Sequence, residues 1–195
     1  DKHKYTNQCL WRNLEKNNKQ VSLAKLEVPK LFVKNIKKKM KQKKKNVSIT
    51  LRESSYTVDR NSSKKDWFKL IKYLEKRKYN IIVIRDFENI HNKDIFEKYE
   101  LFPNASFDIV TRSAIYEISD VNFFVDGGPQ AICWINNYKS ISWKIWGDGK
   151  QRGLYEDNMG LERNEVSKIL DSKRNILLSE NDDFKNLIKF KNNFN

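Results

Sequence analysis

The chain has 195 residues, a mass of 23.3 kDa and a formal net charge of +14, and its length fits one ordinary domain, or one domain with an arm. Hydrophobic residues make up 38%, with only 6 Gly and 3 Pro, which excludes wholly disordered, collagen-like and Pro-rich chains. No apolar run approaches the roughly 18 residues of a membrane span, and the polar first ten residues predict no leading signal peptide.

Residues 1–29 have the weak amphipathic pattern of one or two helices. Nine lysines and no acidic residue follow between Lys30 and Lys45. This run is typical of an exposed helix face or a solvated linker, and equally of a segment that lies on nucleic acid or on an acidic lipid surface. We therefore divide the chain into a helical arm with a basic linker, 1–45, and a folded domain, 46–195.

Beyond residue 45, strand and helix patterns alternate. A β-branched run predicts a strand over 46–51, a polar loop covers 52–61, and Ser62 or Ser63 begins a helix. Four consecutive apolar residues, Ile81–Ile84, predict a strand buried on both faces, as in a parallel sheet. Later elements are a short helix over 94–99, a helix over 107–118, a strand over 121–125, a turn at 126–129, a helix over 130–135, a strand over 140–146, a helix over 161–170, a strand over 175–178 and a closing helix over 183–190.

This order predicts an α/β fold, in which a Rossmann-like, mostly parallel sheet is flanked by helices and preceded by the lysine-rich helical arm. In such sheets, ligands bind beyond the carboxyl ends of the strands. The rule points to three segments, namely the loop after Leu51, the corner Arg85-Asp86 and the turn Asp126–Pro129.

The polar loop after the first strand carries cationic and aromatic candidates. Arg52 can hold a phosphate with two parallel hydrogen bonds. Arg60 and Asn61 close the same loop and add donors, and Tyr56 can stack on a base or a sugar. Each of these side chains, taken singly, also fits an ordinary surface position.

Acidic candidates follow the second strand. Asp86 and Glu88 can accept a hydrogen bond from a sugar hydroxyl or act as a base, although Asp86 also fits a helix cap. Arg112, in the third helix, is expected to pair with Asp108 four residues earlier. Acidic residues in later loops are indistinguishable from solvated ones: Asp148, Glu156 and Asp157.

The turn Gly127-Gly128-Pro129 is the third candidate. Glycines let a backbone approach a ligand closely, and proline fits the first turn of a helix. The amides of the helix that begins at Gln130 then point toward the strand ends, where they can hold an anion. The turn matches neither the dinucleotide-binding fingerprint nor the Walker loop, and it is also compatible with a strand-to-helix turn that binds nothing.

Several strings together resemble the nucleotide-binding half of GT-B-type glycosyltransferases found among bacterial surface-polysaccharide genes. The strings are Val47-Ser-Ile-Thr-Leu-Arg-Glu53, Arg60-Asn-Ser62, Trp67, Ile81-Ile-Val-Ile-Arg-Asp86, Leu101-Phe-Pro-Asn-Ala-Ser106, Arg112-Ser-Ala-Ile-Tyr-Glu117 and Asn122 to Pro129. The resemblance covers residues 46–180 and is carried by strand-end strings rather than by one signature.

The resemblance implies a Rossmann-like domain that binds a nucleotide-diphosphate sugar. The diphosphate would lie against Gly127-Gly128 with Arg52 as its counter-charge. The sugar would pass to a polysaccharide or glycoconjugate acceptor without a metal cofactor, because helix amides and basic side chains neutralise the leaving diphosphate. A GT-B enzyme has two such domains, so the resemblance also implies a second domain or chain that carries the acceptor site.

A second class of function competes with this interpretation. The 39 Lys and Arg against 25 Asp and Glu fit a non-enzymatic protein that binds nucleic acid or an anionic surface through Lys30–Lys45. Abundant Lys beside 22 Asn also fits a composition shared by a whole proteome.

Cys9 and Cys133 lie far apart without metal spacing, which indicates a reducing compartment and predicts a cytoplasmic location, including the inner membrane surface. With only two histidines, His3 and His91, we expect no Cys/His zinc site.

Overall fold

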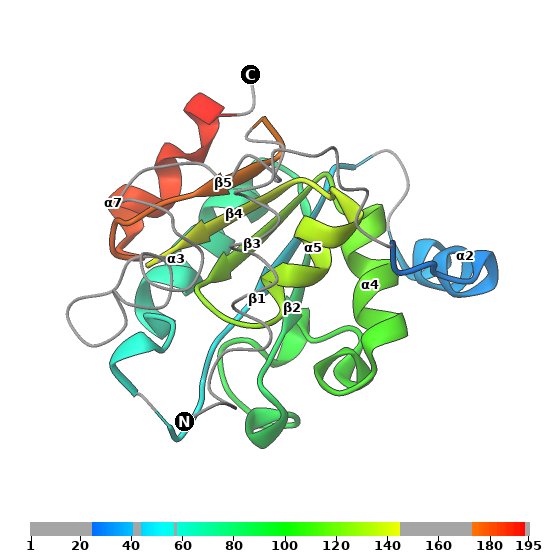
Figure 1. The fold of residues 1–195 in the computed structure, drawn as a ribbon. Helices are drawn as coiled ribbons and strands as arrows, with labels where there is room; N and C mark the ends of the chain where they lie inside the picture. Colours follow the sequence, from blue (N-terminus) through cyan, green and yellow to red (C-terminus); the bar gives the residue numbers. More distant parts are fainter. Residues whose placement is uncertain (1–24, 41–43, 57, 145–172, 194–195) are drawn as a thin grey trace, which may run out of the picture.

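The computed structural model of the chain describes residues 25–40, 44–56, 58–144 and 173–193. Its core is a parallel sheet with helices on both faces (Figure 1). The strands are β1 (Asn46–Thr50), β2 (Asn80–Ile84), β3 (Val121–Val125), β4 (Ser140–Trp143) and β5 (Asn175–Leu177). The helices are α2 (Lys30–Lys39), α3 (Lys64–Lys76), α4 (Ile109–Ile118), α5 (Gln130–Asn136) and α7 (Phe184–Leu187), with 3-10 turns at Val58–Arg60, Phe87–Asn89, Glu97–Tyr99, Pro103–Ser106 and Ile188–Asn193.

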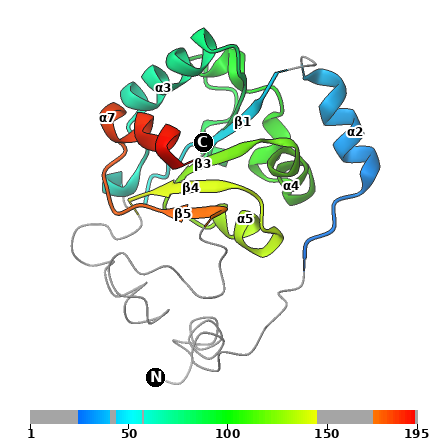
Figure 2. The same cartoon turned by 90° about the horizontal axis from the view of Figure 1, so that it is seen from above.

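The strand order is β2-β1-β3-β4-β5, and every neighbouring pair is parallel. This confirms the predicted α/β, Rossmann-like sheet. The order reverses direction between β1 and β3, because the chain leaves β1 toward β2 and leaves β3 toward β4. Seen from above, α3 and α7 cover one face of the sheet, α4 and α5 cover the other, and α2 lies outside α4 (Figure 2). The reversal point is where open parallel sheets bind ligands.

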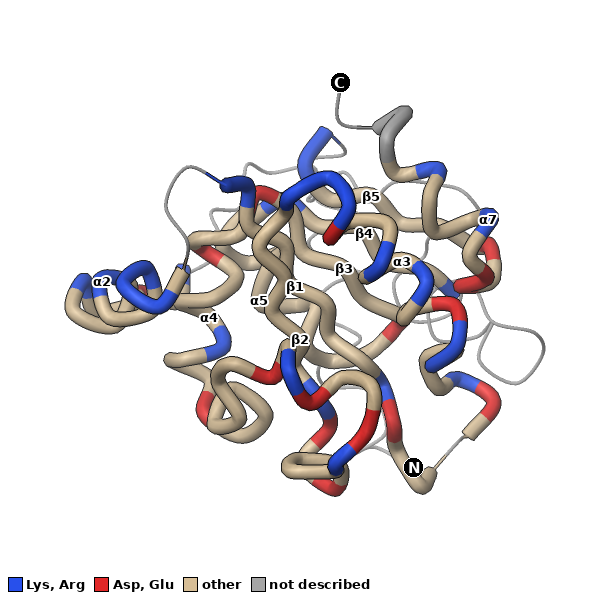
Figure 3. Tube along the Cα trace, turned by 180° about the vertical axis from the view of Figure 1, so that it is seen from behind, with Lys and Arg blue, Asp and Glu red and all other residues tan. Residues whose placement is uncertain are grey.

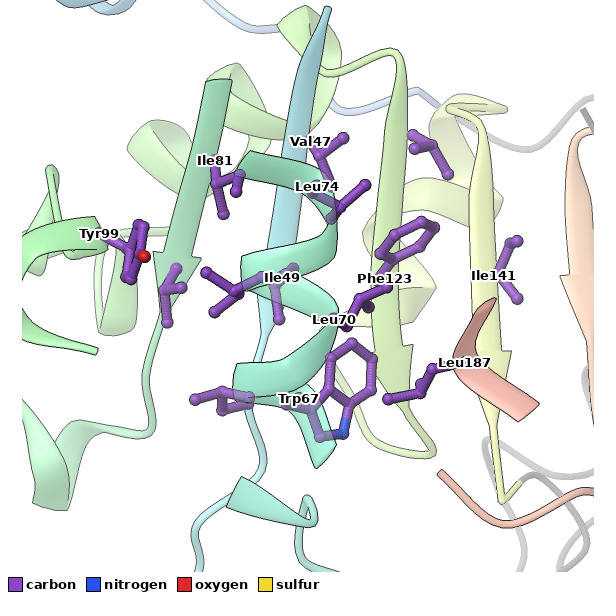
Figure 4. Close-up of a cluster of buried hydrophobic side chains, with 14 of the residues drawn as sticks. Val47, Ile49, Trp67, Leu70, Leu74, Ile81, Tyr99, Phe123, Ile141 and Leu187 are labelled. Carbon is purple, nitrogen blue, oxygen red and sulfur yellow. The ribbon is translucent and has the colours of Figure 1, made fainter. Parts of the chain in front are cut away.

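The α3 face holds the larger apolar core. Alternate residues of the strands point toward α3, and Figure 4 shows Ile49 and Phe123 beneath Leu70 and Trp67. The indole of Trp143 meets the rings of Trp67 and Phe123 edge to face, with both centroid separations at 5.6 Å. Burial of these rings and branched side chains is the main source of stability for this layer.

The α4 face is partly polar although it is buried. Ser48 Oγ donates to Asn122 Oδ1 at 2.5 Å, and Ser140 Oγ donates to Asn175 Oδ1 at 2.8 Å. The strand register places these four residues in one row across β1, β3, β4 and β5. Each serine hydroxyl therefore has its acceptor on the neighbouring strand, while the Nδ2 groups of Asn122 and Asn175 donate to residues outside the strands. These bonds remove most of the cost of burying the polar groups.

The lysine-rich arm is attached to the domain by α2. Ile36 and Met40 are buried in the same cluster as Ala114 and Ile115 of α4. The helix predicted over 94–99 is wrong in extent, because only the 3-10 turn Glu97–Tyr99 forms there. The predicted elements over 161–170 and most of 1–29 lie outside the described residues. None of the described helices is both long and apolar enough to cross a bilayer.

Asp108 caps the amino end of α4. Its carboxylate accepts from the backbone N–H of Val110 at 3.0 Å and of Thr111 at 3.3 Å, and from the Thr111 hydroxyl. The hydroxyl bond comes first among the causes that hold the pKa of Asp108 below its usual value. A lowered pKa adds stability above the unfolded-state value of about 3.9, and that contribution is lost as pH falls through the folded-state value.

We therefore expect Asp108→Ala to lower the free energy of unfolding by about 1 kcal/mol at pH 7, because the first-turn amides lose their acceptor. The difference from the unaltered chain should shrink once the pH falls below about 4. Urea unfolding at a series of pH values measures both quantities. A difference that does not change with pH would contradict the assignment.

Candidate functional site

The three segments expected to form a site do meet at the carboxyl edge of the sheet. The key contact is an ion pair between Arg60, which closes the loop after β1, and Asp126, which follows β3. Arg60 Nη2 lies 2.6 Å from Asp126 Oδ2 and 3.4 Å from the Asp126 carbonyl oxygen. This pair crosses the reversal point between β1 and β3, and it fixes the long loop against the turn that carries the glycines.

Arg52 lies among these charges. Its Nη2 donates to the Tyr56 carbonyl at 3.3 Å. Burial and then the neighbouring charge of Arg60 lower the pKa of Arg52, while Asp86 and Asp126 act against that shift. The predicted cations and carboxylates are therefore close enough to interact, and Arg52 is a guanidinium that a further anion would stabilise.

Asp86 is built into the end of β2. Its Oδ2 accepts from the backbone N–H of Glu53 at 2.5 Å, so the alternative of a helix-capping role does not hold: no cap hydrogen bond joins it to the following 3-10 turn. Oδ1 accepts no hydrogen bond from the described residues, which leaves an oxygen available to a hydroxyl group.

A buried ion pair, which the sequence did not predict, lies beneath these residues. The guanidinium of Arg85 is fully buried and binds Glu53 through two nitrogens, at 2.9 and 2.6 Å. Arg85 Nη1 also contacts Asp94 Oδ1 at 2.8 Å, and Lys64 Nζ lies 3.0 Å from Glu53 Oε1. Burial alone would lower the pKa of Arg85, but the bonds to Glu53 and Asp94 raise it overall. The only signal for it in the sequence is that charged residues stand close to the ends of the first two strands, as Arg52-Glu53 and Arg85-Asp86.

Asn61 has a structural role in the loop. Its carboxamide accepts from the Ser54 N–H at 3.0 Å and donates to the Ser54 carbonyl at 2.8 Å. Ser62 Oγ accepts from the Arg52 N–H at 2.9 Å. These bonds close the loop on itself, so Asn61 positions Arg52 and Arg60.

A second set of contacts joins the loop to residues that follow β4 and β5. Lys144, directly after β4, donates to the Asn61 carbonyl at 2.8 Å and pairs with Asp182 at 2.8 Å. Asp182 is buried and accepts from the Ser63 N–H and the Trp67 indole, both at 2.7 Å. The long sequence separation of these contacts explains why no local pattern pointed to them.

The glycines of the turn are not required by the fold. Neither Gly127 nor Gly128 has a φ angle in the left-handed region, and an added Cβ at Gly127 would make only ordinary contacts, the nearest at 3.6 Å. A Cβ at Gly128 would meet no described atom within 4 Å. Pro129 has a helical φ of −57°, and Gln130 begins α5 and donates from Nε2 to Asp126 Oδ1 at 3.1 Å. At Gly128, the backbone of the turn is therefore not covered by neighbouring side chains.

Aromatic side chains also stand at this edge. Tyr56, at 78% exposure, extends from the loop as expected. Phe87 and Phe107, at 68% and 66% exposure, form an edge-to-face pair with centroids 6.0 Å apart. This pair was not predicted, because isolated phenylalanines give no periodic signal. Exposed rings of this kind are surfaces on which sugars or bases can stack.

Two further predicted residues, Arg112 and Glu88, have partners within the protein. The expected Arg112–Asp108 pair is wrong: Arg112 donates to the carbonyl oxygens of Ala105 and Ser106 at 2.6 and 2.8 Å, because the Asp108 carboxylate caps α4. Glu88 accepts from the Ser55 hydroxyl at 3.3 Å and so joins the two loops. The acidic residues Asp148, Glu156 and Asp157 lie outside the described residues.

The assembled site has two arginines, two aspartates and a glycine turn, drawn from three strand ends. Acidic and basic segments alternate beyond the carboxyl ends of β1 and β2 (Figure 3). Within the described ranges, no group of three or more His, Cys, Asp or Glu could hold a metal ion. Such a site can bind an anion through Arg52 and backbone amides, and hydroxyl groups through Asp86.

No family model, curated protein or solved structure matches the chain.

We expect Glu53→Gln to lower the free energy of unfolding by about 3 kcal/mol, because it leaves the buried guanidinium of Arg85 without its main counter-charge. Glu97→Gln is the matched control: the residue is exposed, and its loss should change stability by less than about 0.5 kcal/mol. Urea unfolding at pH 7 makes the comparison. Equal effects of the two substitutions would show that the buried pair does not hold the strand ends.

Proposed function

We propose that this edge binds the diphosphate of a nucleotide-diphosphate sugar, and that the domain is the donor-binding part of a metal-independent glycosyltransferase. The observation that supports it most is the meeting of Arg52, Arg60, Asp86 and the Gly127-Gly128 turn at the strand reversal. These residues come from three separate segments, and the reversal point is the usual place of nucleotide sites in open α/β sheets.

The balance of charge favours a bound anion. Arg52 is partly buried beside the positive charge of Arg60, which lies 2.6 Å from Asp126, and Arg52 is the cation that we expect a diphosphate to engage. Its lowered pKa, caused by burial and by Arg60, means that an approaching anion relieves an unfavourable interaction. Bidentate bonds from guanidinium to phosphate are strong and directional.

The neighbouring groups suit the rest of such a ligand. Asp86 Oδ1 accepts from no described donor and can accept from a sugar hydroxyl. Tyr56 and Phe87 are exposed rings on the two loops that Ser55 and Glu88 join. In glycosyl transfer the bond from the anomeric carbon to the diphosphate oxygen breaks, a bond to the acceptor oxygen forms, and the acceptor hydroxyl gives its proton to a base, which would belong to the acceptor side. Arg52 and the turn amides would stabilise the leaving charge. The acceptor site would belong to a second domain or chain.

The first test removes Arg52, the positive charge that is proposed to balance the diphosphate. The unaltered chain should be stabilised by about 2.7 kcal/mol when uridine or guanosine diphosphate is present at 100 times its dissociation constant. Arg52→Gln should weaken binding at least about tenfold, since a hydrogen bond to a charged group contributes about 1.5–3 kcal/mol. Thermal unfolding with each nucleotide measures both effects.

Lys76→Gln is the charge-matched control for Arg52→Gln, because Lys76 is exposed at the end of α3 that lies away from the strand ends. It should bind as the unaltered chain does. If no nucleoside diphosphate shifts the unfolding temperature of the unaltered chain, the proposal fails.

The second test separates binding from folding. Gly128→Ala places a methyl group in open space at a φ that alanine tolerates, so stability should stay the same or rise by up to about 1 kcal/mol. Affinity for the nucleoside diphosphate should fall, and fall further for Gly128→Leu, because the side chain occupies the position of the ligand. Unchanged affinity in both variants, measured by titration calorimetry, would remove the turn from the site.

A further inference from the structure

The outward face of α2 is strongly cationic, and the donor site does not involve it. The helix has the sequence KLFVKNIKKK, with five lysines and no acidic residue. All five lysines are exposed, and the described residues form no ion pair with any of them. Figure 3 shows the blue lysine segments of α2, separated by tan uncharged ones, at the side of the domain.

The helix is held so that this face points away from the protein. Ile36 and Met40 are buried against α4. Residues at spacings of three and four share one side of a helix, so Lys34 and Lys38 lie with Leu31 on the side opposite Ile36. The lysines are therefore presented on a fixed helix.

Apolar side chains accompany the charge. Leu31, on the lysine face, is 65% exposed, and Phe32, at the edge of the side that carries Ile36, is 40% exposed. Exposed Leu and Phe among lysines are typical of helices that lie in the interface of a bilayer, where the lysines meet anionic headgroups and the apolar groups enter the acyl boundary. Phosphate backbones of nucleic acids would engage the lysines but give Leu31 no apolar partner.

We propose that α2 docks the protein onto an anionic lipid bilayer through Lys30, Lys34, Lys38 and the exposed Leu31. The helix lies outside α4, on the far side from α3 and α7 (Figure 2). This placement allows docking without displacing any element that covers the sheet. The inference stands on α2 alone and does not require that the strand-end site bind a nucleotide.

The test uses the full chain and sedimentation with vesicles. One set is phosphatidylcholine alone, and the other is phosphatidylcholine mixed with phosphatidylglycerol. The protein should bind the mixed vesicles and not the neutral ones, and binding should weaken as salt is raised. The triple variant Lys30→Gln/Lys34→Gln/Lys38→Gln should bind about a hundredfold more weakly, because each lysine near an anionic surface contributes about fivefold.

A matched triple variant, Lys65→Gln/Lys76→Gln/Lys93→Gln, removes the same charge from exposed positions elsewhere and should lower binding by less than about fivefold in total. Leu31→Ser should weaken binding several-fold at unchanged net charge, because an apolar group no longer enters the interface. Circular dichroism and thermal unfolding check that each variant folds.

Several results would overturn the proposal. These are absence of binding to the mixed vesicles, equal binding to both kinds of vesicle, an equal loss in the two triple variants, and full vesicle binding by Leu31→Ser. A mixed-sequence DNA duplex serves as the alternative ligand. If the duplex binds in a manner that depends on the three α2 lysines while the vesicles do not bind, the partner is a nucleic acid and the bilayer is excluded.

Discussion

The buried pair of Glu53 and Arg85 is the interaction on which the strand-end site depends. Each residue is charged and almost wholly withdrawn from water, so neither can leave the other without a large loss of free energy. Glu53 follows β1 closely and Arg85 follows β2 directly, and their two hydrogen bonds hold the two strand ends at a fixed spacing. Arg52 and Asp86, which adjoin the pair in the sequence, are positioned by it.

The topology accounts for the rest of the arrangement. Because the strand order reverses between β1 and β3, the chain leaves these two strands toward opposite faces of the sheet. Side chains from both exits can then meet without a helix between them, and Arg60 and Asp126 do so. The charges of Asp86 and Asp126 reduce, without removing, the cost of partly burying the Arg52 guanidinium beside Arg60.

Most of the sheet could be predicted from the sequence, because strands buried on both faces are runs of β-branched and aromatic residues. The run Ile81–Ile84 and the strand over 121–125 are predicted in this way, and the strand-end rule then selects three segments that do meet at one edge of the sheet. Side-chain roles were harder to predict. Asn61 was expected to contact a ligand and instead closes its own loop, and Arg112 binds backbone carbonyls rather than Asp108. Such outcomes depend on which neighbours tertiary packing brings within reach, and the local pattern does not contain that information.

The row formed by Ser48, Asn122, Ser140 and Asn175 has a consequence for how sequence change can accumulate in this fold. Exchange of one member for an apolar residue of similar size would leave the facing Oγ or Oδ1 atom of its partner without this hydrogen bond inside the protein, which costs more than the bond itself contributed. Exchange of both partners at once avoids that cost. The residues of each pair are therefore expected to change together or not at all, while the aromatic and aliphatic side chains under α3 are free to vary singly within the limits of volume.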